Sequence, residues 1–190
     1  MVITIARECG CDGDEVGKRL SEKYSIPCYA KAELIRLAKK KNIYDKYPFF
    51  FGELPVDVMM NSMAEDFQMR LYKTPKEALA KLLGEQSCVV IGRASDYAFK
   101  GRKDAVRIFL CGDKSKRVQR IAQKHGITER KAQAVVEQTD HRRSGYHNYY
   151  SGEQWGYAGN YDLCLNKSRL GIDGVVDMIA AYIKTVGIKK

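Results

Sequence analysis

A glycine-rich turn near the start of the chain has the residue types of an anion-binding site. The turn, CGCDG at residues 9–13, follows a short β-branched run from Val2 to Ala6 and precedes an amphipathic pattern from about Asp14 to Tyr24. At a junction of strand, turn and helix, unpaired backbone N–H groups and the positive end of the helix dipole converge, and phosphate is their usual guest. The same spacing also fits a plain tight connection. The turn alone leaves both interpretations open.

The turn departs from the common phosphate-loop pattern GxxxxGK[ST], which needs a lysine after the second glycine and then a hydroxyl. In one frame Arg7 takes the place of the first glycine and Gly13 that of the lysine. In the other, Lys18 follows Gly17, but Asp12 replaces the first glycine. Arg7 stands at the end of the predicted strand. Its guanidinium could bind phosphate in a bidentate manner and partly replace the missing lysine, or it could pair with a nearby carboxylate.

A second candidate anion ligand follows another apolar run. Gly92 and Arg93 come directly after the run from Cys88 to Ile91. In open parallel sheets, ligands bind in the crevice beyond the carboxyl ends of the strands. Arg93 is therefore predicted to bind an anion, with a structural salt bridge as the alternative.

Charged side chains also gather on two predicted helices further along. The first helix carries Arg117, Arg120 and Lys124 on one stripe, at i, i+3 and i+7. The two cationic surfaces could close over a polyanion, or they could simply be solvated. The charged residues on or beside the second helix are Lys131, Asp140, Arg142 and Arg143.

Other chemistry has little support in the sequence. His125, His141 and His147 lack the spacing of a metal cage, and no Ser/His/Asp or Cys/His nucleophile pattern occurs. We therefore predict neither a metal cage nor covalent catalysis. The tyrosine-rich segment 144–160 is typical of a surface that stacks nucleic-acid bases or, alternatively, of a cap that packs on the core.

The composition is that of one globular domain. The chain has 190 residues, 45% of them hydrophobic and 10% aromatic, and 33 Lys+Arg against 23 Asp+Glu give a formal net charge of +10. These values exclude a mainly disordered chain. The charge fits a nucleic acid, an acidic membrane face, a small polyanion such as a nucleotide, or a merely solvated surface.

The sequence also bears on location. No run approaches the roughly 18 apolar residues of a membrane span, and no basic segment with a long apolar stretch follows Met1. We therefore expect a cytoplasmic protein with no membrane partner. Its six cysteines include no CxxC pair and are expected to be reduced.

Apolar runs alternate with helical patterns along the chain, which predicts a parallel sheet with helices on both faces. The segment from 42 to 55 is aromatic and irregular, and we expect a packed loop there. The helix from 57 to 83 should break near Thr74-Pro75. The predicted strands are 2–6, 26–29, 88–91, 105–111 and 161–165, and the helices are 14–24, 32–41, 57–83, 113–124, 128–141 and 172–184.

Four long segments, taken in order, resemble one known family. They are ITIARECGCDGDEVGKRLSEKYSIPCY, SCVVIGRASDYAF, RIFLCGDKSKRVQRIAQKHG and TDHRRSGYHNYYSGEQWGYAGNYDLCLNKSRLGID, of which the last is the most specific. The resemblance that rests on them covers nearly the whole chain. On these segments the chain resembles the cytidylate kinase-like family, a branch of the nucleoside monophosphate kinases within the P-loop fold.

The resemblance implies one α/β domain over 1–190, a P-loop-type parallel sheet of about five strands flanked by helices. Its core would comprise 1–41, 84–126 and 161–190. A helical insertion at about 42–83 would bind the acceptor, and a helical lid would lie at about 127–160.

The resemblance also implies an activity, transfer of the γ-phosphoryl group of ATP, with Mg²⁺, to a pyrimidine nucleoside monophosphate such as CMP. Small-molecule nucleotides would then be its partners, and nucleic acid is disfavoured. In this interpretation the ATP-binding residues are Gly10, Cys11, Asp12, Gly13, Asp14, Arg117 and Arg120, the acceptor-binding residues are Arg93, Asp140 and Arg143, and the candidate catalytic residues are Arg7, Arg142 and Arg143.

The chain departs from the family at three points. The loop lysine and hydroxyl are missing, Asp12 replaces a glycine, and Ala94 follows Arg93 where true cytidylate kinases have aspartate. Two alternatives therefore stay open, a nucleotide-binding protein with weak or no transfer activity and an RNA-binding module.

Overall fold

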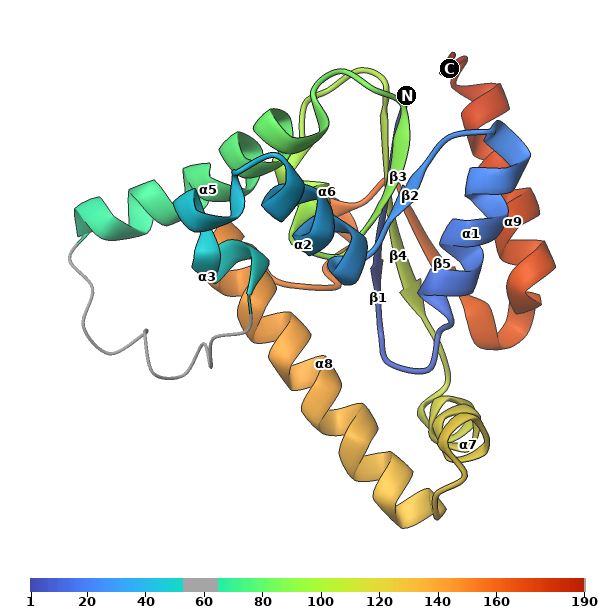
Figure 1. The fold of residues 1–190 in the computed structure, drawn as a ribbon. Coiled ribbons are helices and arrows are strands. Elements are labelled where there is room, and N and C mark those ends of the chain that lie inside the picture. Colours follow the sequence, from blue (N-terminus) through green and yellow to red (C-terminus); the bar gives the residue numbers. More distant parts are fainter. Residues whose placement is uncertain (53–64, 190) are drawn as a thin grey trace.

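The structure, a computed structural model, describes residues 1–52 and 65–189. A five-stranded sheet lies at its centre, with the strand order β2-β3-β1-β4-β5 and parallel pairing throughout (Figure 1). The strands are β1 (Val2–Arg7), β2 (Cys28–Tyr29), β3 (Cys88–Ile91), β4 (Ala105–Cys111) and β5 (Leu163–Asn166). The predicted fold class, a parallel sheet of five strands flanked by helices, is confirmed.

The helices cover the two faces of the sheet and build one apolar core on each. The first core joins Ile3 and Ile5 of β1 to α1 (Gly13–Tyr24) and α9 (Lys167–Thr185). The second lies on the opposite face and includes Phe50 and Leu79. It is covered by α2 (Lys31–Lys40), α3 (Pro48–Phe51), α5 (Glu65–Leu83) and α6 (Ser95–Ala98). Because β1 is buried on both faces, its sequence VITIAR is mostly apolar rather than regularly alternating, and Thr4 is buried within it.

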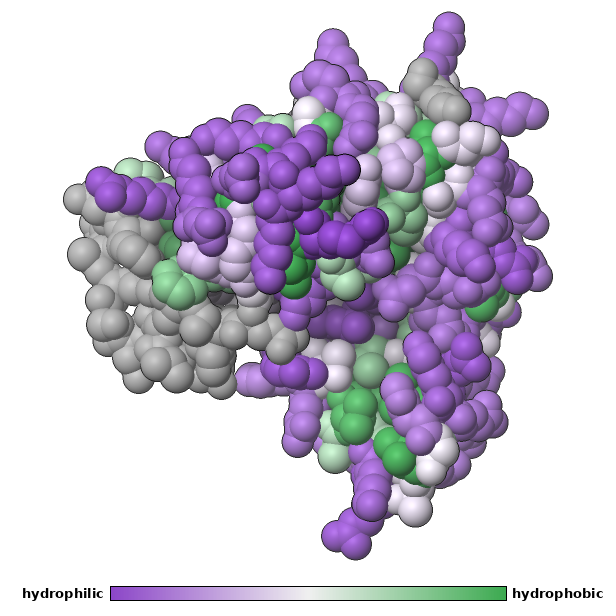
Figure 2. All heavy atoms as spheres, in the orientation of Figure 1, coloured by the Kyte–Doolittle hydropathy of each residue, from purple (hydrophilic) through white to green (hydrophobic). Residues whose placement is uncertain are grey.

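Two further helices extend away from the sheet. These are α7 (Lys114–His125) and α8 (Glu129–Ser151), which pack against each other through Val118, Ile121 and Val136. Figure 1 shows α8 running from the foot of the molecule up to α5 and α3, and Figure 2 shows apolar side chains between α7 and α8 on an otherwise largely hydrophilic face. Two short 3₁₀ turns, Tyr44–Lys46 and Ala158–Asn160, complete the described elements.

Helix α8 is longer than the sequence suggests. We predicted an end near His141, followed by a tyrosine-rich segment that either stacks bases or packs on the core, but the helix continues to Ser151. Tyr149 and Tyr150 are buried in the second core. Burial of these aromatic rings stabilises the last turns in spite of their modest helix propensity.

The predicted break near Thr74-Pro75 is wrong, because α5 continues through Pro75. The hydroxyl of Thr74 donates to the carbonyl of Arg70 at 3.1 Å, next to the position where proline supplies no N–H. Residues 57–64 of the predicted helix lie outside the described ranges. The predicted division into core, insertion and lid stays a prediction.

Several smaller expectations can be compared with the structure. Thr128 caps α8, since its Oγ1 accepts from the Lys131 amide, and Gly126 ends α7 with φ 62°. Asp113 precedes α7 but makes no side-chain cap, because its carboxylate accepts from Asn166. In the predicted packed loop, Phe50 and Phe51 are fully buried within α3.

All six cysteines are free thiols. Among the helices of the described ranges, none is both long and apolar enough to cross a bilayer.

Gly17 allows α1 to approach the sheet closely. A Cβ at this position would lie 2.6 Å from Ile91 Cδ1 and 3.1 Å from Cys28 Sγ. We expect Gly17→Ala to lower the free energy of unfolding by about 1–3 kcal/mol through overpacking, measured by urea denaturation. Gly174→Ala in α9 is the control, since its methyl would meet only Leu170 at 3.3 Å or more. Equal stability of the two variants would contradict the prediction.

Candidate functional site

A cavity of about 560 Å³ opens beyond the carboxyl ends of β1 and β3 and is covered by α8. Its lining is strongly cationic. Arg7 ends β1, Arg93 follows β3, Lys31 begins α2, and Arg142 and Arg143 come from α8. The place agrees with the rule that ligands of open parallel sheets bind at this edge.

The side chain of Arg7 lies across the glycine turn. A Cβ at Gly13 would be 2.8 Å from Arg7 Cγ, and a Cβ at Gly92 would be 2.5 Å from Arg7 Nη1. Arg7 therefore occupies the space that a side chain at position 13 would need. Glycine at the lysine position and arginine at the first glycine position are thus two parts of one arrangement, which places a cation between the turn and the end of β3.

The Arg7 guanidinium has little compensating negative charge. Its side chain is only 16% exposed, and its one recorded carboxylate partner, Asp14, is 68% exposed and lies 3.5 Å away. Burial lowers the pKa of Arg7 to about 10, with a further lowering from Arg143 that Asp14 opposes. Arg143 Nη1 in turn donates to the carbonyl of Arg7 at 3.1 Å. Two guanidinium groups thus meet at the cavity, and a bound anion would relieve their repulsion.

Asp12 pairs with cations of two other elements. It precedes α1 in the left-handed region, with φ 49°, and makes no side-chain cap. Its carboxylate, 6% exposed, accepts from Arg120 Nε at 3.0 Å and from Lys167 Nζ at 2.5 Å. Burial acts to raise the pKa of Asp12, but the hydrogen bonds from Lys167 and Arg120 outweigh it and hold the pKa below its usual value.

Lys167 was missed in the sequence. The signal available was a lysine directly after the last apolar run, at the same edge of the sheet as the glycine turn.

A buried network ties the turn to α7 and α8. Arg117, 7% exposed, donates through Nη1 to Asp140 Oδ2 at 2.7 Å and to the Cys9 carbonyl at 3.1 Å, and through Nε to the Gly112 carbonyl at 3.0 Å. Asp140 Oδ1 accepts from the Cys9 amide at 2.6 Å. Glu8 joins the network 3.3 Å from Arg117. One amide of the turn is therefore already bound to a carboxylate of the protein.

The turn contributes to this arrangement mainly through its backbone. Gly10 has φ 88°, and a Cβ there would lie 2.8 Å from the Arg117 carbonyl oxygen. The Cys11 thiol is buried in the first core, and burial raises its pKa to about 12. The Cys11 amide donates to the Glu8 carbonyl at 3.3 Å, so both polar groups of Cys11 that could donate face the protein rather than a ligand.

The backbone of Arg93 is strained, and its guanidinium group is hydrogen-bonded to other parts of the protein. It donates through Nη1 to the carbonyls of Phe50 at 2.8 Å and Gly52 at 3.2 Å, and through Nη2 to that of Phe51 at 2.7 Å. Its guanidinium also lies 4.9 Å from the Tyr146 ring centroid. Arg93 and the following Ala94 have φ of 61° and 47°, which is costly for residues with a side chain. Arg93 therefore caps α3, and a further side-chain hydrogen bond joins it to Tyr146 of α8.

A buried ion pair lies at the wall of the same cavity. His147 Nε2 on α8 is 2.7 Å from Asp96 Oδ2 on α6, and His147 Nδ1 is 3.2 Å from the carbonyl of Glu153. Burial acts to lower the pKa of His147, but the hydrogen bond and charge of Asp96 outweigh it and raise that pKa. This pair could not be predicted from spacing, since its members are 51 positions apart.

We expect this pair to stabilise the protein at low pH. A pKa that is raised by folding contributes stability below the unfolded value of about 6.5, and that stability is lost as the pH rises through the folded value. His147→Gln should therefore lower the free energy of unfolding by about 2 kcal/mol at pH 6, with a smaller difference at pH 9. Urea denaturation at both values measures this. His125→Gln, at an exposed position, is the control, and a pH-independent loss in His147→Gln would contradict the prediction.

The structure brings some of the predicted site residues to the cavity and not others. Arg7, Arg93, Arg142 and Arg143 line it. Arg117, Arg120 and Asp140 do not, and instead hold the turn through the contacts above. The predicted ATP-binding residues of the glycine turn are not part of the cavity lining either; they are Gly10, Cys11, Asp12, Gly13 and Asp14. Among the residues described, no cluster of three or more His, Cys, Asp or Glu could hold a metal ion.

Together, the parallel sheet and the glycine turn after its central strand define a kinase-like protein of the P-loop fold. A gluconokinase from Sinorhizobium meliloti has the same fold, with a TM-score of 0.54 at 12% identity over 97% of this chain and 92% of that one. The chain belongs to the cytidylate kinase-like family, whose model matches residues 2–169. The family identified from the sequence is confirmed.

Two relatives cover the chain almost completely. A curated protein named cytidylate kinase, from Methanocorpusculum labreanum, is 26% identical over 190 residues, which are 98% of each chain. The crystal structure of an uncharacterized protein from Eubacterium ventriosum has a TM-score of 0.74 and 29% identity, over 97% of this chain and 98% of that one.

Proposed function

We propose that this protein is a nucleotide kinase that transfers the γ-phosphoryl group of ATP to a pyrimidine nucleoside monophosphate such as CMP. The family and the relative named cytidylate kinase support the reaction class. The observation that carries the proposal is the meeting of Arg7 and Arg143 between the glycine turn and the end of β3. A phosphoryl group in transit needs cations at that place.

The residues divide between the two nucleotides. The amides of Asp12, Gly13 and Asp14, at the start of α1, face no side-chain cap and would hold the phosphates of ATP. Arg93, Arg142 and Arg143, which line the cavity, would hold the phosphate of the acceptor. An oxygen of that phosphate attacks the γ-phosphorus as the bond to the ADP oxygen breaks, and Arg7 stabilises the charge of the transferred group.

Mg²⁺ fits this site only as a companion of the nucleotide. It usually keeps several waters and binds one or two carboxylates with substrate phosphates. Asp14, largely exposed at the turn, is the carboxylate of this chain that would meet it, since Asp12 is already paired. Bound there with ATP, the ion would neutralise phosphate charge.

A second candidate, a nucleotide-binding protein with weak transfer activity, is favoured by one observation. The Asp12 carboxylate pairs with both Arg120 and Lys167, so phosphates must compete with it for these cations. The RNA-binding alternative loses much of its motivation, because Tyr149, Tyr150 and Tyr161 are buried and do not form a stacking surface.

The deciding experiment is ADP formation in a coupled assay with each nucleoside monophosphate. We expect a pyrimidine monophosphate to support turnover and Arg143→Ala to abolish most of it. Arg19→Ala is the matched control, since that arginine is exposed on α1 and pairs with Glu15 and Asp173. If no monophosphate gives turnover above Arg143→Ala while ATP still binds in calorimetry, the weak alternative replaces the proposal.

A further inference from the structure

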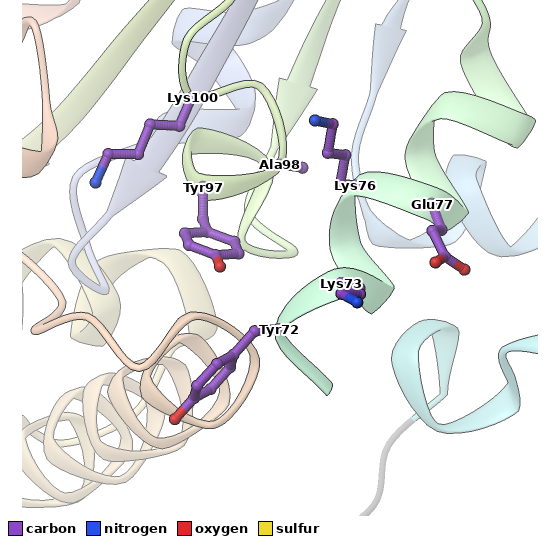
Figure 3. Close-up of a pocket in the computed structure, with 7 residues that line it drawn as sticks. All are labelled: Tyr72, Lys73, Lys76, Glu77, Tyr97, Ala98 and Lys100. Carbon is purple, nitrogen blue, oxygen red and sulfur yellow. The ribbon is translucent and has the colours of Figure 1, made fainter. Parts of the chain in front are cut away.

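A second cavity, of about 480 Å³, lies between α5 and α6, apart from the lining of the first (Figure 3). Its wall has an aromatic part and a cationic part. The residues that line it are Tyr72, Lys73, Lys76 and Glu77 of α5, Tyr97 and Ala98 of α6, and Lys100. It shares no residue with the cavity lined by Arg7 and Arg143.

Two of its lysines are available to an anion. Lys100 is paired with Glu153 at 2.5 Å, and Glu77 accepts from the Tyr47 hydroxyl at 3.2 Å. Lys73 and Lys76 are exposed and have neither an ion pair nor a hydrogen bond with any residue in 1–52 or 65–189. They lie three positions apart on α5, so both ammonium groups reach the same side of the helix.

The tyrosines supply flat apolar surface beside these cations. Tyr72 and Tyr97 are both half-buried. The ring of Tyr72 packs close to Gly152 at the end of α8, 3.0 Å from the place of a Cβ there. Figure 3 shows the two rings on one side of the cavity and Lys73 and Lys76 on the other. An aromatic ring that carries a phosphate matches both parts.

The helix α6 is shared between the two cavities. Ala94, just before it, and Asp96 line the reaction cavity, whereas Tyr97 and Ala98 line the second one. Asp96 also holds His147 of α8. A ligand that displaces Tyr97 therefore acts on four residues whose other side forms the acceptor wall.

We propose that the second cavity binds an aromatic phosphate of the nucleoside monophosphate class, and that its occupancy is transmitted through α6 to the reaction cavity. Stacking on Tyr72 or Tyr97 would hold the base, and Lys73 with Lys76 would hold the phosphate. This binding does not depend on phosphoryl transfer.

Alanine methyl resonances in NMR can test the two sites separately, because Ala98 lines the second cavity and Ala94 the first. The probe is AMP, with adenosine and inorganic phosphate as its two halves. We expect AMP to shift the Ala98 methyl resonance with a saturation curve that differs from that of Ala94. Adenosine and inorganic phosphate should each bind there more weakly than AMP. The double variant Lys73→Ala/Lys76→Ala should weaken this event by about tenfold or more, the equivalent of 1.4 kcal/mol, and leave binding at Ala94 intact.

The control variant is Lys23→Ala/Lys184→Ala, which removes two exposed lysines from the ends of α1 and α9. It should bind AMP as the wild type does. Tyr72→Leu keeps apolar volume and should weaken AMP but not phosphate. The single tryptophan, Trp155, lines the reaction cavity, so its fluorescence reports that site. If occupancy is transmitted through α6, the part of the AMP-induced fluorescence change that follows the Ala98 curve should be lost in Lys73→Ala/Lys76→Ala, and its persistence there would contradict the transmission.

Three results would overturn the proposal. In the first, the Ala98 methyl resonance does not shift at millimolar AMP. In the second, it shifts with the same saturation curve as the Ala94 methyl, and the curve is the same in Lys73→Ala/Lys76→Ala as in the wild type. In the third, inorganic phosphate binds at Ala98 as tightly as AMP does. None of these results depends on turnover, so the kinase proposal is tested separately by the coupled assay.

Discussion

Replacing Arg7 with alanine is expected to lower kcat for phosphoryl transfer by about 10²- to 10³-fold, the usual effect of losing one oriented donor to a developing charge. Arg7 is the buried cation that lies between the glycine turn and the end of β3. Because its action is on the transferred group, KM for either nucleotide should change less than kcat. Steady-state kinetics with both substrates varied measures the two effects, and Arg19→Ala is the charge-matched control.

A reciprocal exchange tests whether Arg7 stands in for the missing lysine. Gly13→Lys alone should be inactive and less stable, since its Cβ would lie 2.8 Å from Arg7 Cγ. Arg7→Gly/Gly13→Lys restores the first glycine and the lysine of the common loop and removes that clash, while Asp12 and Asp14 stay at the positions of the second glycine and the hydroxyl. We expect the double variant to exceed both single variants in kcat, which is strong coupling between the two sites. A double variant no better than the worse single one would show that Arg7 has a different role.

The second large effect is expected at Asp140. Asp140→Ala removes the nearer of two carboxylate partners of the buried Arg117 guanidinium, at 2.7 Å, and the acceptor of the Cys9 amide, while Glu8 remains 3.3 Å from Arg117. Because Glu8 still compensates part of the charge, we expect the free energy of unfolding to fall by about 3 kcal/mol, the lower end of the cost of breaking a buried pair, as measured by urea denaturation. The turn should loosen as well, which would raise KM for ATP more than KM for the acceptor.

Two variants control this result. Asp140→Asn keeps an acceptor for the Cys9 amide and should recover part of the stability and of the ATP affinity. Glu137→Ala, on the same helix, removes an exposed partner of Lys114 and should change little. A loss in Asp140→Ala no greater than in Glu137→Ala would mean that the network does not hold the turn.

The sheet could be predicted from the sequence because most residues of its longer strands are apolar. The bounds of β3 and β4 agree with the runs at 88–91 and 105–111. The length of α8 could not be predicted in this way. Its first half packs on α7 through Ala132 and Val136, and its last turns pack on the second core through Tyr149 and Tyr150. Two partners on different sides leave no single apolar stripe along the helix.

The candidate site divides in the same manner. Arg7 and Arg93 could be found because each directly follows a strand, where the fold places ligands. Their surroundings could not, since the partners of charged groups are distant in sequence. Lys167 is 155 positions from Asp12, and Asp140 is 131 positions from Cys9. The spacing of residues in a sequence predicts contacts within one helix or strand, whereas these contacts join residues of different elements.

The length of α8 has a mechanical consequence. Its 23 residues span about 34 Å at 1.5 Å per residue. Asp140 grips the glycine turn near its middle, and His147 is anchored to α6 two turns further on. A single rigid helix therefore contacts both the glycine turn and α6. Tilting α8 would move the glycine turn and α6 together, so that in the proposed kinase the release of the two nucleotides would be coupled.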